Sequence, residues 1–83
     1  MPLLSKFYGI SIKMYFKQSE HNPPHIHAIY GDNAAAIDLN GKVLDGDITP
    51  KALAFVREWL SLHKSEVEHI WETQDFAEIE PLK

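Results

Sequence analysis

The stretch that decides the fold is residues 8–17, which read YGISIKMYFK. Within it the apolar side chains of Ile10, Ile12, Met14 and Phe16 alternate with more polar ones. A period of two residues is typical of a β-strand that buries one of its faces. We therefore predict a strand over residues 8–17 and a sheet built around it.

Working outward from this strand, the chain continues as short apolar segments separated by turn-forming residues. Further strands are predicted at residues 25–30, 34–39 and 42–44. Between the last two lies Asn40-Gly41, a dipeptide preferred by type I′ hairpin turns, in which both central residues need a positive φ. Short turns join antiparallel neighbours, so the sequence predicts an antiparallel meander of three to four strands.

A long helix is predicted after the sheet. Thr49 followed by Pro50 is a suitable N-cap and first-turn pair, because proline lacks an N–H that would in any case be unbonded there. From Leu53 to Trp71 apolar residues recur at spacings of three and four, the period of an amphipathic helix. This stripe fits either one helix or two helices that meet at a kink near Lys64.

Together these elements predict an α+β protein in which a C-terminal helix packs on one face of an antiparallel meander. The expected domain is single, residues 1–83, with the sheet at about residues 7–44 and the helix at about residues 50–74. Residues 75–83 form an acidic tail. This tail is either solvated or a docking segment, with Phe76, Ile79 and Leu82 set among its carboxylates.

Composition narrows the class of protein. The chain has 83 residues, no cysteine, and 12 acidic against 8 basic side chains, for a net charge of −4. This balance argues against a general nucleic-acid binder, although residues 1–31 alone carry three lysines, one glutamate and three of the five histidines. No signal peptide or membrane span is expected, and the lack of cysteine fits a reducing compartment. So short a chain suggests a partner subunit, either a homo-oligomer or another protein.

A candidate site follows from the period of the strands. If the apolar side chains face the helix, residues 8–17 present Lys13, Tyr15 and Lys17 on the opposite face, and the next strand presents His25 and His27 there. Two histidines two residues apart on a strand have Cα atoms roughly 6.5 Å apart. That spacing suits either a shared metal ion or a general acid paired with a general base.

The first interpretation of this site is acid–base chemistry on RNA. RNA carries its own nucleophile in the 2′-OH, so cleavage needs a base, an acid and cations but no metal. In this interpretation His25, His27 and His21 are catalytic. Lys13 and Lys17 bind the phosphate, and Tyr15 stacks on a base or bonds the phosphate.

The alternative is a metal site in which His21, His25 and His27 bind zinc or another divalent ion. Pro23-Pro24 would restrict the loop that holds His21, and Asp38 from the third strand could supply an oxygen ligand. Each of these residues also has a purely structural reading, as a loop hydrogen bond or a solubilising charge. For His63, which interrupts the helical stripe, the structural reading is preferred.

Several segments carry a family resemblance. They are Phe7-Tyr8-Gly9-Ile10, Met14-Tyr15-Phe16, the run from His21 to Gly31 (HNPPHIHAIYG), Val56-Arg57-Glu58-Trp59-Leu60, Leu62-His63 and Trp71. In these segments the chain resembles the small bacterial proteins of the domain of unknown function 4160 family. The family usually has an aromatic residue between the last two histidines, where this chain has Ile26.

The resemblance implies a bacterial, cytoplasmic protein encoded beside a second small protein. It also implies that the pair is a type II toxin–antitoxin module in which this chain is the toxin. The resemblance supplies no catalytic residues, so the chemical roles above rest on the residues themselves. We therefore expect a toxin that acts on RNA as a ribonuclease. A non-catalytic adaptor or regulatory module that binds a metal or a protein stays open as the alternative.

Overall fold

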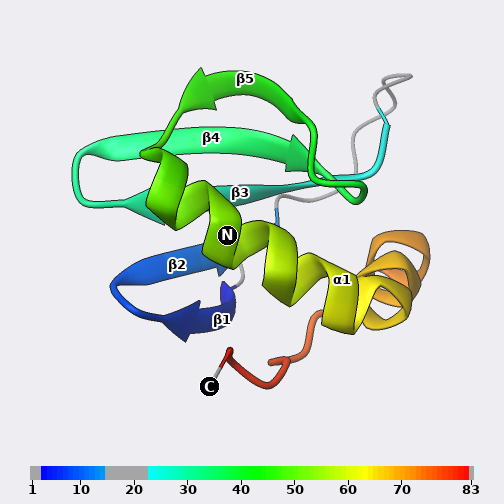
Figure 1. The fold of residues 1–83 in the computed structure, drawn as a ribbon. Helices are drawn as coiled ribbons and strands as arrows, with labels where there is room; N and C mark the ends of the chain where they lie inside the picture. The colour runs from blue at the N-terminus through cyan, green and yellow to red at the C-terminus, as the bar shows by residue number, and fades with distance from the viewer. Residues whose placement is uncertain (1–2, 15–22, 83) are drawn as a thin grey trace.

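In the part of the chain that the structure describes, five antiparallel strands form one sheet, and a long helix crosses one of its faces (Figure 1). The computed structural model describes residues 3–14 and 23–82. The elements are β1 (Leu3–Phe7), β2 (Ile10–Lys13), β3 (His25–Tyr30), β4 (Asn33–Asp38), β5 (Val43–Asp47) and α1 (Pro50–Thr73). The strands follow one another in space in the order of the chain. The predicted α+β class and meander are thus confirmed, with five strands rather than three to four.

The extra strand comes from a hairpin that the sequence reading missed. The strand predicted from residue 8 begins two residues later, because Tyr8 and Gly9 form the turn between β1 and β2. Both have positive φ, 51° and 79°, as a type I′ turn requires. Tyrosine is uncommon in that backbone region, so only Gly9 marked the turn. The predicted end of the strand, residues 15–17, lies outside the described residues.

The loop between β4 and β5 also differs from its prediction. Gly41 has a φ of 90°, but Asn40 is not among the residues with positive φ, so the turn is not type I′. The Gly41 N–H donates to the carbonyl of Asp38, and the Asp38 carboxylate accepts from the backbone N–H groups of Asn40 and Lys42. The side chain of Asp38 therefore sets the loop conformation, with Gly41 in the left-handed position.

Helix α1 begins and bends close to the predicted places. The Thr49 side chain accepts from the Ala52 N–H, and Pro50 occupies the first turn. His63 has non-helical angles, one residue before the predicted kink at Lys64. The helix ends at Gln74, whose left-handed conformation closes the last turn through a bond to the Ile70 carbonyl.

The core lies between α1 and the facing side of the sheet. The predicted inward residues Ile10, Ile12, Met14, Ile26 and Ala28 are all buried there. Tyr30, the last residue of β3, is also predicted to face inward. It pairs with the buried Ile10 and lines one cavity together with Phe55 of α1, so it lies on the helix side of the sheet, although 38% of it is exposed. On the helix, Trp59 is fully buried and its ring stacks on that of Phe7.

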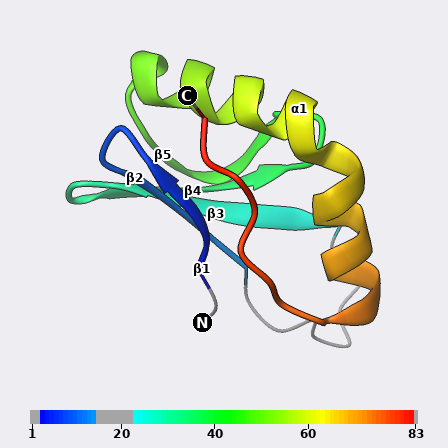
Figure 2. The ribbon, with the colours of Figure 1, turned by 90° about the horizontal axis from the view of Figure 1, so that it is seen from below.

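Residues 74–82, which we call the C-terminal strap, return from the helix to the first strand (Figure 2). The Ile79 N–H donates to the Leu4 carbonyl at 2.6 Å, and the Trp59 indole N–H donates to the Glu80 carbonyl at 2.9 Å. Ile79 and Leu82 are buried in the core, and Phe76 packs against it. The interpretation of these apolar residues as a docking segment for another protein is therefore wrong.

The other face of the sheet, which we call the outer face, carries no described helix or strand (Figures 1 and 2). Its side chains form two rows across the five strands, set by the register of the pairs. The first row is Lys6, Ser11, Ile29, Ala34 and Asp47; the second is Leu3, Lys13, His27, Ala36 and Asp45.

Candidate active site on the outer face

The structure brings three of the predicted site residues together. His27 on β3 pairs directly with Lys13 on β2, and both lie on the outer face as the period of two requires. His25 precedes His27 by two residues on the same strand and is half-buried. The other three predicted residues, Tyr15, Lys17 and His21, lie outside the described residues.

The two histidines are close neighbours with different surroundings. Their ring centroids are 5.1 Å apart, with the planes at 69°. The Nδ1 of His25 lies 2.8 Å from the Pro23 carbonyl oxygen, so Nδ1–H donates and Nε2 is left for another partner. The His25 ring also lies 5.3 Å from that of Trp71 on the last turns of α1. A backbone bond and an indole ring thus hold His25 in place.

The surroundings of His27 lower its pKa. Burial lowers its pKa below the ordinary value of 6.5, and the adjacent His25 lowers the pKa further. Both causes disfavour the charged imidazolium. His27 is therefore neutral near pH 7, which is the state that a general base or a metal ligand needs.

Asp38 has a structural role in the described part of the chain. It pairs with His25 across the sheet, but its Oδ1 accepts the two loop N–H groups described above. Within residues 3–14 and 23–82, no group of three histidine, cysteine, aspartate or glutamate side chains could hold a metal ion. A site with three histidines needs His21, which lies outside this part.

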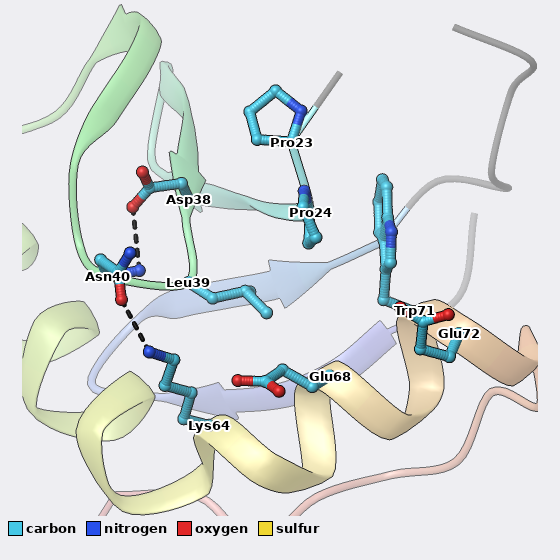
Figure 3. Close-up of a pocket in the computed structure, with 9 residues that line it drawn as sticks. All are labelled: Pro23, Pro24, Asp38, Leu39, Asn40, Lys64, Glu68, Trp71 and Glu72. Carbon is cyan, nitrogen blue, oxygen red and sulfur yellow. Dashed lines mark hydrogen bonds between the residues drawn. The ribbon is translucent and has the colours of Figure 1, made fainter. Parts of the chain in front are cut away.

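A cavity of about 270 Å³ lies next to the site, between the Pro23-Pro24 segment, the β4–β5 loop and α1 (Figure 3). Asn40 accepts a hydrogen bond from Lys64 at one side of it. Its ionisable lining residues are Asp38, Lys64, Glu68 and Glu72. Three carboxylates against one ammonium disfavour a phosphate in this cavity.

Charge on the outer face changes sign from one edge to the other. Lys6 and Lys13 lie on the first two strands, whereas Asp45 and Asp47 lie on the fifth. Between them the first row holds only small or apolar side chains. The basic half, which adjoins His27, is the half that can attract a phosphate.

His63 on α1 has the contacts of a structural residue. His63 is half-buried, its Nδ1 lies 2.9 Å from the Glu66 carboxylate, and its ring packs on Trp59. This fits the structural reading that was preferred for it. Trp71 is buried at the end of the predicted apolar stripe, and it also contacts His25, a contact for which the sequence carries no signal.

The fold and the site define a class: a small α+β protein whose outer sheet face carries a paired histidine and lysine. The chain belongs to a family described only as a domain of unknown function, DUF4160, whose model matches residues 9–72. No curated protein and no solved structure matches it significantly. In the described part of the chain, no helix combines the length and hydrophobicity needed to cross a membrane.

Proposed function

We propose that this protein binds single-stranded RNA on the basic half of the outer face and cleaves it with His25 and His27. The observation that carries the proposal is the cluster itself: two histidines with rings 5.1 Å apart, and a lysine directly opposite one of them. A base, an acid and a cation on one face are the groups that cleavage by the 2′-OH requires.

The surroundings of each group suggest its role. His27, neutral because its pKa is lowered, takes the proton from the 2′-OH. The 2′-oxygen then attacks phosphorus and the bond to the 5′-oxygen breaks. The protonated Nε2 of His25 gives its proton to that leaving oxygen while Nδ1 stays bonded to Pro23. Lys13 stabilises the charge on the phosphate, and the products are a 2′,3′-cyclic phosphate and a 5′-hydroxyl.

The test is cleavage of a labelled single-stranded RNA by the purified protein in the presence of a chelator. We expect fragments that end in a cyclic phosphate, and no cleavage of the same sequence made as DNA. His25→Ala and His27→Ala should each lower the rate by about 100-fold or more. His69→Ala, which changes an exposed histidine on the helix, is the matched control and should leave the rate unchanged.

Lys13→Ala, compared with Lys42→Ala in the β4–β5 loop, tests the phosphate contact. The first should weaken RNA binding, and the second should not. Rates that are equal in the wild type and in both histidine variants, or cleavage that requires added metal, would overturn the assignment of these roles.

The biological setting belongs to the same proposal. The resemblance to the 4160 family supports a toxin of a bacterial type II module, acting in the cytoplasm and neutralised by a small protein encoded alongside. Expression of this chain alone should arrest growth, co-expression of the neighbour should relieve the arrest, and the His25→Ala, His27→Ala double variant should be harmless. Arrest by a correctly folded double variant would place the toxic activity elsewhere.

One observation favours the alternative function of metal binding. The Nδ1–H of His25 bonds to a backbone carbonyl, which is the usual outer contact of a histidine that binds metal through Nε2. Zinc titration distinguishes the two. A one-to-one complex that His21→Ala abolishes, in a protein without nuclease activity, would favour a metal-binding adaptor.

A further inference from the structure

The charged and small side chains of the first row are arranged about the centre of the outer face in a pattern that RNA binding does not require. The first row crosses all five strands, with Lys6 at one end, Asp47 at the other and Ile29 in the centre on β3. Ser11 and Ala34, both small, flank the centre at equal distance. Reflection of this row about β3 exchanges a cation for an anion and one small side chain for another.

Such a row is complementary to a second copy of itself. Two sheets can face each other about a twofold axis parallel to β3. In that arrangement β3 lies over β3 of the partner subunit, β1 lies over its β5, and β2 lies over its β4. Lys6 then lies over Asp47 of the partner subunit, and Ile29 over Ile29 of the partner subunit. In the second row Lys13 comes to lie one strand away from Asp45 of the partner subunit, within reach of its long side chain.

The other twofold arrangement is disfavoured. An axis across the strands would place the β5 edge of one copy over the β5 edge of the other, so that Asp45 and Asp47 would face the same acidic edge. Like charges placed opposite each other repel across an interface, so that arrangement is disfavoured. Charge therefore selects the axis parallel to β3.

The centre of the face permits close approach. Ser11, Ala34 and Ala36 are small, and Ile29 is half-buried with an apolar side chain. Facing sheets with such side chains pack about 10 Å apart with their strands nearly aligned. The rows span four interstrand spacings, about 19 Å, which is a small patch by the standards of stable dimers. We expect association to be weak and sensitive to salt.

We propose that a second copy of this chain packs on the outer face, with β3 against β3 about a twofold axis parallel to that strand. Because the dimer covers Lys13 and His27, it competes with RNA for the same surface. This regulatory consequence rests on the function proposed above, whereas the dimer itself does not.

The test is sedimentation equilibrium without RNA at low salt, from low to high micromolar protein. The wild type should dimerise, and Lys6→Glu and Asp47→Lys should each weaken association at least about tenfold. An equimolar mixture of the two variants should form a one-to-one heterodimer about as tight as the wild-type dimer, because every pair is again of opposite charge. Lys51→Glu and Asp75→Lys, which make the same charge changes elsewhere, should have no effect.

A sample mixed from isotope-labelled and unlabelled protein tests the contact between the two β3 strands directly. It should show a nuclear Overhauser effect between the Ile29 methyl groups of the two subunits. A wild type that stays monomeric, a mixture that does not associate, or a dimer whose affinity does not depend on these charges overturns the proposal.

The competition is then measured by adding single-stranded RNA to the dimer. If RNA neither binds to the dimer nor dissociates it, the proposed function is contradicted and the proposed dimer stands. If a monomeric wild type cleaves RNA, the proposed dimer is contradicted and the proposed function stands.

Discussion

Two neighbouring histidines in this protein differ because of what each one touches. His25 is fixed by a backbone carbonyl and an indole ring, whereas His27 is half-buried opposite a lysine. The surroundings thus fix the orientation of the His25 ring and disfavour the charged form of His27. The same separation of two chemically identical groups is how active sites assign acid and base roles.

The lowered pKa of His27 makes a prediction about folding. The unfolded chain binds a proton at this residue near pH 6.5, and the folded chain does so only at lower pH. As the pH falls below 6.5, protonation therefore favours the unfolded state, and the stability that neutral His27 permits is lost. In urea titrations at pH 7.5 and 5.5, His27→Gln should show a smaller loss of unfolding free energy than the wild type. His69→Gln is the control, and an equal loss in His27→Gln and the wild type would contradict the assignment.

Two glycines provide a matched test of backbone strain against steric overlap. Gly46 and Gly31 both have positive φ, 78° and 61°. A Cβ at Gly46 would overlap the carbonyl oxygen of Ala34 on the adjacent strand, whereas a Cβ at Gly31 meets nothing within 4 Å. Gly31→Ala should cost about 1 kcal/mol, the price of the left-handed conformation alone. Gly46→Ala should cost about 3 kcal/mol or more by urea denaturation, and equal costs would show that the strand moves aside freely.

At the scale of elements, the segments with strong local signals were predicted well. Residues 25–30 were predicted as a strand with these bounds, because the alternation is regular and two prolines precede it. The helix was predicted within a residue, since Thr49 caps it through its own side chain. Period two was also enough to group Lys13, His25 and His27 on one face.

The elements that depend on distant contacts were missed. The first hairpin places a tyrosine where asparagine is usual, so local preference pointed the wrong way. The docking of the strap depends on the shape of the completed core, which no local pattern encodes. The contact between Trp71 and His25 depends on how a helix bent at His63 crosses the sheet.

The strap makes a prediction at this scale. Ile79 is 6% exposed and also donates its N–H to β1, so truncation of its side chain leaves a cavity against the first strand. Ile79→Ala should lower the unfolding free energy by about 2–4 kcal/mol. Glu78→Ala, which changes the exposed neighbour, should change it by less than about 0.5 kcal/mol. A small effect of Ile79→Ala in urea denaturation would mean that the strap contributes little to the fold.

For the whole molecule, the net charge of −4 conceals two edges of opposite sign on one face. A protein with few cations in its site should show only a shallow dependence of RNA affinity on salt. For single strands, each phosphate contact contributes about −0.7 to the slope of log affinity against log salt. Lys13→Ala should therefore reduce the magnitude of the slope by about 0.7. Lys51→Ala, a lysine at the start of the helix, should leave the slope unchanged, and the same reduction in both variants would indicate non-specific binding.

The bond between Ile79 and Leu4 has a further consequence for the order of folding. All neighbouring strands are joined by local connections, so the meander can form early through contacts that are close in sequence. The strap joins nearly opposite ends of the described chain, and its closure is expected after the transition state. Weakening the strap should then accelerate unfolding and leave the folding rate almost unchanged. The last residues to join the core would in this way determine how long the native state survives once formed.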